Sequence, residues 1–170
     1  KRHLKKTDLL DRPADMWRYL EVLPVDEDAE IVTLGEGFTP LLRMQRLGRL
    51  LGLEQVYYKD EAINPTGTFK ARGLSAAVSM TRKLGIAELC IPTAGNAGGA
   101  LAAYGAQAGM RTHVFMPQDT PRANYLEAVI TGAHVVKVDG LISDAARYMQ
   151  REMEGRRSEE HTSELQSQFR

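Results

Sequence analysis

The second half of the chain alternates apolar runs with helical patterns, and this alternation restricts the possible folds more than any other feature. The runs AELCIPT, RTHVFMP and AHVVKVDG are expected strands, and each is followed by a helical pattern, at 94–110, 120–132 and 142–155. Short links between strands and helices in this order favour parallel strands with right-handed crossovers. We therefore predict an α/β fold, a parallel three-layer sheet with βαβαβα order.

Two residues in this half have specific expected roles. Thr120 precedes Pro121 and a helical pattern, so we expect Thr120 as N-cap and Pro121 at the first helical position. Cys90 is the only cysteine, which excludes an internal disulfide, and it lies in the apolar run LCIP. We expect it to be a buried structural thiol.

The first 85 residues are less regular. The pattern predicts a helix ending at Gly85, and before it three other features: a short helix within 11–24, a glycine- and proline-rich loop within 31–44, and a short helix followed by a strand around 55–59.

Composition excludes several classes of partner. The 170 residues carry 22 Lys+Arg and 22 Asp+Glu, so zero net charge gives no reason to expect nucleic acid or an anionic membrane. No apolar run has the length of a membrane span, and the basic start is not followed by the apolar segment of a secretory signal. We expect a cytoplasmic protein.

The segment TAGNAGG, residues 93–99, lies where a strand is expected to end and a helix to begin. Ligands bind at this edge of open α/β sheets, and unpaired N–H groups of the first helical turn suit a carboxylate or phosphate. Asn96 adds an amide that can donate and accept. The alternative is a tight turn whose glycines serve close packing, and the pattern is not the G-x-G-x-x-G of dinucleotide sites.

The segment NPTGTFKARG, residues 64–73, places Lys70 between turn-forming residues and a helical pattern. A positive charge is electrostatically disfavoured at a helix start. A neutral amine is what Schiff-base chemistry requires, so Lys70 is a candidate for such chemistry. The alternative is a lysine whose amine extends to solvent.

Three segments in this order resemble the fold-type II (tryptophan synthase beta-like) pyridoxal phosphate enzymes: GEGFTPL at 35–41, KDEAINPTGTFKARG at 59–73 and TAGNAGGALAAYGAQAG at 93–109. The resemblance runs from about Leu34 to Arg147, and within the family it is greatest to the threonine synthases. It implies pyridoxal 5′-phosphate as cofactor, and a truncated, N-terminal portion of such an enzyme.

The resemblance also implies roles for individual residues. Lys70 matches the lysine that binds the cofactor as a Schiff base, and Asn96 matches the residue that hydrogen-bonds the pyridine 3′-oxygen. The turn that binds the substrate carboxylate in this family corresponds to Thr93, Ala94, Gly95, Asn96 and Ala97. Ala94 departs from the family pattern, because many relatives have serine or threonine there.

The activity implied by the resemblance is that of a carbon–oxygen lyase converting O-phosphohomoserine and water to threonine and phosphate. Alternatives with the same cofactor are a threonine/serine dehydratase and a cysteine-synthase-like enzyme. Two further alternatives are a nucleotide-binding module that uses residues 93–99 as a phosphate turn, and an inactive fragment. The implied partner is a small amino-acid substrate, and the full-length parent is expected to be a homodimer.

For several other polar side chains, a structural or solvent-exposed role is favoured over a functional one. Three arginines are candidates for substrate phosphate, although solvation or salt bridges explain them better: Arg72, Arg111 and Arg122. Asp60 and Glu61 can orient Lys70, but a salt bridge at the loop edge is favoured, and the histidines at 113 and 134 are expected to be structural. No histidine or cysteine cluster has metal-site spacing.

We expect three segments along the chain. Residues 1–85 form the N-terminal part of the large domain with the lysine loop, residues 86–156 form a small Rossmann-like βαβ domain, and residues 157–170 are a non-native tail. The tail, from Arg157 to Ser167, can be back-translated into a common sequencing-library adapter, so the native coding sequence is expected to stop near Arg156. The resemblance implies a glycine-rich phosphate loop and a partner for the pyridine nitrogen, and no segment after Arg147 matches either.

Overall fold

The computed structural model describes residues 4–168, with side chains up to Arg156. The chain forms two compact units, which we describe separately. Unit 1 comprises the residues up to Ala87 together with Gln107–Gly109, and unit 2 comprises Glu88–Ala106 and the residues from Met110 onward. The boundary at Ala87 lies close to residue 85, where we expected one, but the assignment of these segments to parts of a larger enzyme stays a prediction.

Unit 2 is built on one parallel sheet with the strand order β3-β4-β5. The strands and helices alternate along the chain as β3 (Glu88–Pro92), α3 (Asn96–Gln107), β4 (Arg111–Pro117), α4 (Arg122–Ile130), β5 (His134–Val138) and α5 (Ile142–Gln168). The predicted α/β class and βαβαβα order are confirmed. Helix α5 continues past residue 155, where the helical pattern of the sequence ends.

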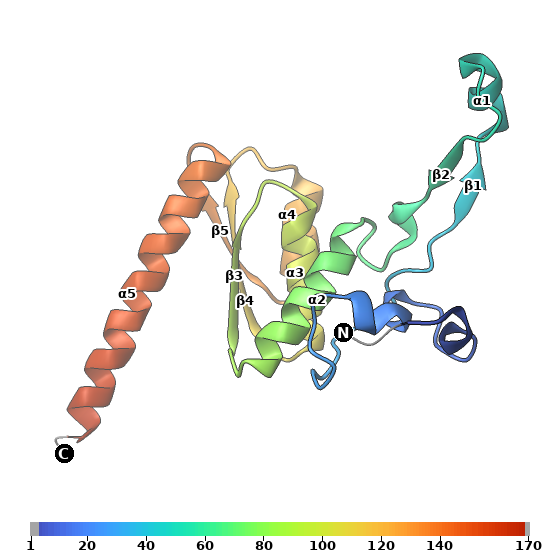
Figure 1. Ribbon diagram of the computed structural model, residues 1–170. Helices are drawn as coiled ribbons and strands as arrows, with labels where there is room; N and C mark the ends of the chain where they lie inside the picture. The colour runs from blue at the N-terminus through green and yellow to red at the C-terminus, as the bar shows by residue number, and fades with distance from the viewer. Residues whose placement is uncertain (1–3, 169–170) are drawn as a thin grey trace. The chain divides into compact units, whose positions relative to one another are not determined.

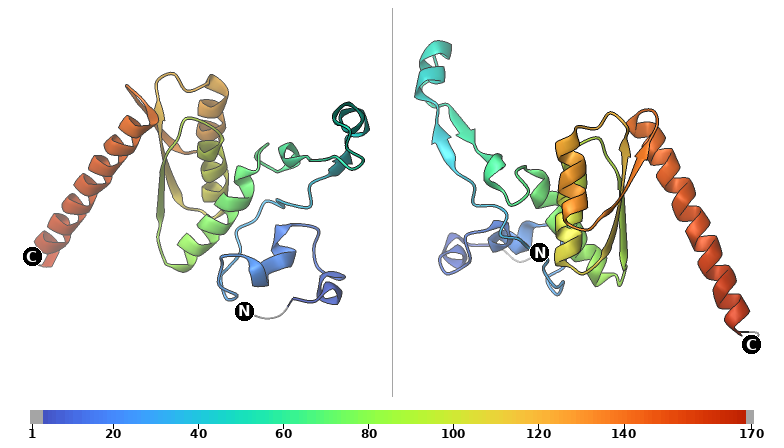
Figure 2. Two further views of the ribbon diagram at one scale, coloured as in Figure 1. Left: turned by 45° about the horizontal axis from the view of Figure 1, so that its top comes forward. Right: turned by 180° about the vertical axis from the view of Figure 1, so that it is seen from behind.

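The sheet of unit 2 has a helical layer on each face (Figures 1 and 2). Val114 and Met116 of β4 are fully buried and face α3, since a Cβ added to Gly98 would lie 2.9 and 3.0 Å from their side chains. Phe115, on the opposite face, has its ring centroid 6.1 Å from that of Tyr148 on α5. This alternation gives the predicted three layers.

Three glycines of α3 are required by packing. A Cβ at Gly105 would lie 2.2 Å from Thr112 Oγ1 of β4, and one at Gly98 would lie 2.8 Å from Thr93 Cγ2. A Cβ at Gly99 would lie 2.7 Å from Glu127 Oε2 of α4. Close packing therefore explains why the sequence has glycine at these three positions of α3.

The prediction for Cys90 is wrong, because the residue is exposed. Cys90 lies on the edge strand β3, with its side chain on the opposite face from buried Leu89. Helix α5 packs against the sheet on the Cys90 face but leaves this thiol open to solvent. The apolar run in the sequence therefore did not predict burial correctly here, because an edge strand is covered by a neighbouring strand on one side only.

The predicted cap of α4 is also wrong. Pro121 is the N-cap, Arg122 begins the helix, and no side chain caps it. Thr120 is instead buried in a turn in which its N–H donates to Pro117 O at 3.2 Å, and its hydroxyl has no hydrogen-bond partner. The turn draws the Thr120 side chain inward, away from the helix N-terminus.

Unit 1 contains a short antiparallel pair and one long helix. Strand β1 (Leu41–Arg43) pairs with β2 (Tyr57–Lys59), with α1 (Gln45–Leu51) between them. Helix α2 spans Lys70–Lys83, and three 3₁₀ helices complete the unit: Lys6–Leu9, Met16–Val22 and Glu61–Ile63. The helix expected within 11–24 is thus a 3₁₀ helix, which Asp15 begins by accepting a hydrogen bond from Trp17 N.

A buried carboxylate anchors the loop that carries GEGFTP. Glu36 has an exposed fraction of 0% and accepts hydrogen bonds from Trp17 Nε1 at 2.7 Å, from Leu34 N at 3.0 Å and from the hydroxyl of Ser75 on α2. Gly35 and Gly37, on either side, have φ of 88° and 105°, where a side chain is strained. The carboxylate therefore ties the N-terminal segment, the loop and α2 together.

No helix in the described part of the chain combines the length and the apolar character that a membrane crossing requires.

Candidate active site

Lys70 is the first residue of α2, as the sequence indicated. Gly67, with φ of 67°, turns the chain before it, and Thr68 Oγ1 accepts a hydrogen bond from Lys70 N at 3.1 Å. The Lys70 ammonium lies 4.8 Å from the Phe69 ring centroid. Within the described residues it forms no salt bridge, so its amine is not occupied by a carboxylate.

A polar network fixes the loop that precedes Lys70. Arg72 binds Glu61 through two hydrogen bonds, Nε to Oε2 at 2.6 Å and Nη2 to Oε1 at 2.8 Å. Thr39 donates to the same carboxylate at 2.6 Å and Asn64 Nδ2 at 3.0 Å. The hydrogen bond from Arg72 is the main reason that the pKa of Glu61 falls from 4.5 to about 2.

The contacts in this network show what Arg72 and Glu61 bind, which the sequence left open. Arg72 is salt-bridged, and Glu61 pairs with Arg72 and makes no contact with the Lys70 amine. Asn64 Oδ1 also accepts from Gly37 N at 3.0 Å, so the lysine loop and the GEGFTP loop are joined directly. Asn64 and Thr39 were not identified from the sequence, although both lie inside the quoted motifs.

The turn at residues 93–97 lies in unit 2, between β3 and α3. Thr93 is buried, and its N–H donates to Phe115 O of β4 at 2.9 Å. Thr93 Oγ1 accepts from Gly95 N at 3.1 Å, which closes the turn. Gly95 differs from the packing glycines, since a Cβ there would meet nothing within 4 Å. Asn96 and Ala97 open α3, so their backbone N–H groups have no partner within the helix.

Among the described residues, the side chain of Asn96 has one hydrogen bond, which comes from α4. Asn124 Nδ2 donates to Asn96 Oδ1 at 2.8 Å. The acceptor end of the Asn96 amide is therefore used, and its Nδ2 is left as a donor. Asn124 was missed in the sequence, because a contact between two helices leaves no local signal.

The structure thus assembles part of the predicted site within each unit. Unit 2 brings Thr93, Gly95, Asn96 and Ala97 into one turn, with Ala94 exposed beside them. Unit 1 places Lys70 at the start of a helix, behind a braced loop.

The remaining polar candidates are salt-bridged, exposed to solvent or buried in the sheet. Arg111 Nε lies 2.5 Å from Glu88 Oε1, in a salt bridge, and Arg122 is exposed. His113 is buried in β4, and desolvation, followed by the charge of Arg156, lowers its pKa. In the described part of the chain, no group of three histidine, cysteine or acidic side chains is arranged to hold a metal ion.

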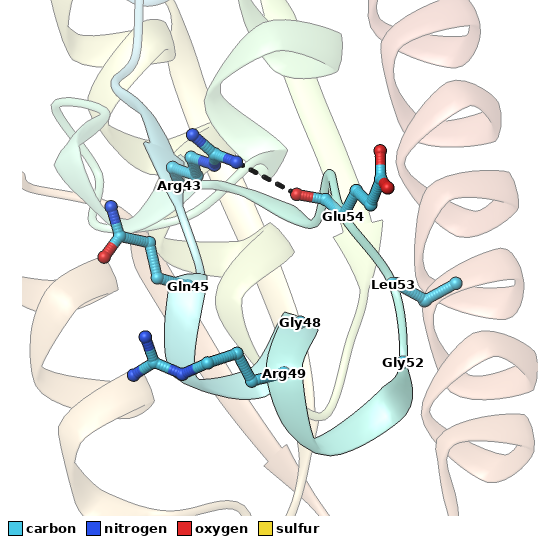
Figure 3. Close-up of a pocket in the computed structure, with 7 residues that line it drawn as sticks. All are labelled: Arg43, Gln45, Gly48, Arg49, Gly52, Leu53 and Glu54. Atoms are coloured by element: carbon cyan, nitrogen blue, oxygen red, sulfur yellow. Dashed lines mark hydrogen bonds between the residues drawn. The ribbon is translucent and has the colours of Figure 1, made fainter.

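Two pockets lie in unit 1, and neither is lined by Lys70. One, of about 350 Å³, is formed around α1 and is bridged by a hydrogen bond from Arg43 Nη2 to Glu54 O at 3.0 Å (Figure 3). The other, of about 510 Å³, includes Phe38, Thr39 and Arg72. The second pocket therefore borders the network that braces the lysine loop, whereas the first contains none of the predicted site residues.

A family model described as "Pyridoxal-phosphate dependent enzyme" matches residues 32–163. The chain belongs to this family. The match includes the GEGFTP loop, the lysine loop and the turn before α3. Membership implies pyridoxal phosphate as cofactor, as the resemblance indicated.

Curated relatives of the chain include several threonine synthases. That of Methanocaldococcus jannaschii is 40% identical over 138 residues, covering 81% of this chain and 34% of the relative. That of Halalkalibacterium halodurans is 41% identical over 123 residues, covering 72% and 34%. The chain thus spans about a third of the length of the curated relatives it matches.

Solved structures of the same fold include other enzymes. A pyridoxal 5′-phosphate-dependent aspartate racemase is similar with a TM-score of 0.65 and 28% identity, over 69% of this chain and 37% of that one. The diaminopropionate ammonia lyase of Escherichia coli is similar with a TM-score of 0.66 over 74% of this chain and 37% of that one, and its 20% identity shows the fold alone. The fold-type II assignment is therefore confirmed.

The residues present fit parts of this cofactor. Lys70 offers an amine without a carboxylate partner, and Asn96 offers an amide donor whose acceptor end is already used. Open space at Gly95 and the backbone N–H groups of Asn96 and Ala97 suit a carboxylate at the start of α3.

Proposed function

We propose that this chain is part of a lyase of the threonine synthase type, which converts O-phosphohomoserine and water to threonine and phosphate. The observation that carries the proposal is Lys70, which opens α2 with its amine outside every salt bridge of the described residues while the adjacent loop is braced through Arg72 and Glu61. Identities of 40% and 41% to threonine synthases support this substrate over the alternatives.

The proposal gives Lys70, Asn96 and Ala97 specific tasks. Lys70 would hold the cofactor through its Nζ, and once this amine is free and neutral it would be the base that takes the proton from the substrate α-carbon. When bound, pyridoxal phosphate withdraws electrons from that carbon. The Asn96 Nδ2 group would donate to the cofactor 3′-oxygen, and the N–H groups of Asn96 and Ala97 would hold the substrate carboxylate.

The lysine assignment is tested by trapping. The chain is mixed with pyridoxal phosphate, reduced with hydride and digested, and the labelled peptide is identified by mass spectrometry. We expect the label on Lys70 and its loss in Lys70→Ala. Lys83→Ala is the matched control, because Lys83 lies on the same helix but pairs with Asp26 and Asp28. A label retained in Lys70→Ala would transfer the role to another lysine.

The substrate is tested in a chimera in which this sequence replaces the matching third of the Methanocaldococcus jannaschii threonine synthase. We expect phosphate release from O-phosphohomoserine and formation of threonine. Deamination of threonine, or conversion of O-acetylserine, in the absence of phosphate release would instead identify a dehydratase or a cysteine-synthase-like enzyme.

A further inference from the structure

The contact between Asn124 and Asn96 joins the first turns of two helices in unit 2. Asn124 Nδ2 donates to Asn96 Oδ1 at 2.8 Å. An amide has an acceptor at one end and donors at the other, so a rotation of Asn96 by half a turn would set its NH₂ against the NH₂ of Asn124. With the Asn124 NH₂ directed towards Asn96, as the structure has it, the contact therefore favours one of the two orientations of the Asn96 amide.

The donor is held on a fixed element. The Asn124 N–H donates to Pro121 O at 3.0 Å in the first turn of α4, and Ala128 in the same helix is fully buried in the core of unit 2. One turn further on, α3 and α4 are in close contact, because a Cβ at Gly99 would lie 2.7 Å from Glu127 Oε2. Gly99 lies three residues after Asn96, and Glu127 lies three residues after Asn124. The missing side chain at Gly99 therefore lets the two helix starts approach each other.

We propose that Asn124 is a positioning residue for the site, which holds the Asn96 amide with its Nδ2 donor directed to the cofactor 3′-oxygen. The proposal rests on the role given to Asn96 under the proposed function. A hydrogen bond of ordinary net strength biases the two orientations by roughly two- to ten-fold. Without the Asn124 amide the two orientations become equally populated, so binding of pyridoxal phosphate should weaken by up to about two-fold, whereas a reversed bias should weaken it by up to about ten-fold.

Two substitutions separate positioning from general support of the fold. Asn124→Ala removes the bias. Asn124→Asp keeps the size of the side chain but offers only acceptors, so it attracts the Asn96 NH₂ and turns the amide round. We expect Asn124→Asp to weaken binding more than Asn124→Ala, and both to shift the visible absorption band of the bound cofactor in the same direction as Asn96→Ala. A structural role alone would make the isosteric variant the milder one.

The test is a double-mutant cycle on the 170-residue chain, with the dissociation constant for pyridoxal phosphate and the position of the absorption band as readouts. In an Asn96→Ala background, both Asn124 substitutions should lose their effect, which also excludes a simple effect of the added negative charge. Val129→Ala, an exposed position on the same helix, is the control and should leave both readouts unchanged.

The outcomes are distinguishable. A bound, lysine-linked cofactor in the unchanged chain together with independent effects of the Asn96 and Asn124 substitutions would overturn the positioning role and leave the proposed function standing. Absence of any lysine-linked cofactor in both the unchanged chain and the chimera would refute the proposed function, and the positioning role with it.

Discussion

At the scale of single residues, the lysine loop depends on one carboxylate. Glu61 is bound by Arg72, Thr39 and Asn64, and these contacts link the loop to the GEGFTP motif. Hydrogen bonds to a charged group contribute roughly 1.5–3 kcal/mol each. These hydrogen bonds together therefore contribute enough stabilising free energy to hold the backbone before Lys70 in one conformation.

Acid should weaken this network. The pKa of Glu61 is lowered from 4.5 to about 2, so the folded state prefers the ionised carboxylate. The resulting stability is present above pH 4.5 and is lost as the pH falls from 4.5 towards about 2. Denaturant unfolding across this range should show a steeper loss in the unchanged chain than in Glu61→Gln. Parallel pH profiles for the two proteins would contradict the role of Glu61.

Asn96→Ala should separate binding from turnover. In the chimera, we expect the variant to keep the lysine-linked cofactor with a shifted absorption band, and turnover to fall about ten- to a hundred-fold, as a lost hydrogen bond to a charged group predicts. Absorption spectra and phosphate release measure the two effects. Unchanged kinetics would favour a turn that serves only the fold.

At the scale of elements, the glycines of the helices differ in role although the sequence shows them alike. Gly105 in α3 faces β4 with no room for a Cβ, whereas Gly73 in α2 faces open space. Alanine at Gly105 should destabilise unit 2 by roughly 1–3 kcal/mol through overpacking. Alanine at Gly73 should stabilise α2 by up to about 1 kcal/mol through helix propensity.

Thermal unfolding of the two variants provides the comparison, since each adds one methyl group to a helix. Melting temperatures that move in opposite directions are expected. A Gly105→Ala variant as stable as the unchanged chain would mean that the helix–sheet distance in unit 2 is larger than the structure shows.

These elements also show which features of the fold could be predicted from the sequence and which could not. The order of strands and helices was predictable because apolar periodicity reflects burial on each face of a sheet, and the position of Lys70 at the start of a helix was predictable from its turn residues. The exposure of Cys90 was not, because it depends on which strand lies at the edge. The Asn96–Asn124 contact was not predictable either, because residues 28 apart meet only after two helices pack.

At the scale of the whole chain, apolar side chains gather on the segment from β1 to β2. Those at least 48% exposed are Leu41, Leu42, Leu50, Leu51, Leu53 and Tyr57. Many exposed apolar side chains within one short segment promote association. We therefore expect the chain to self-associate, and sedimentation to show less association after Leu50→Glu combined with Leu53→Glu.

The control for this prediction is Leu10→Glu, because Leu10 is 78% exposed but lies outside this segment. It should leave association unchanged. A monodisperse monomer in the unchanged chain would contradict the expectation.

We also expect the 170-residue chain to bind pyridoxal phosphate more weakly than the chimera does, and to release no phosphate from O-phosphohomoserine. In the proposed function, Lys70 and the turn at 93–97 would supply a covalent bond and a few hydrogen bonds, whereas the resemblance implies further charge-assisted contacts to the cofactor phosphate. Titration with the cofactor and a phosphate-release assay measure both properties. Robust turnover by the chain alone would show that the residues described here suffice.

The hydrogen bond from the Trp17 indole to the buried Glu36 carboxylate has an optical consequence. The chain contains one Trp, so its tryptophan fluorescence arises at a single known place. The acceptor belongs to the GEGFTP loop, and opening of that loop would admit water to the indole and move its emission to longer wavelength. The molecule thus carries a built-in fluorophore beside this loop, and the loop can be followed in solution without an added label.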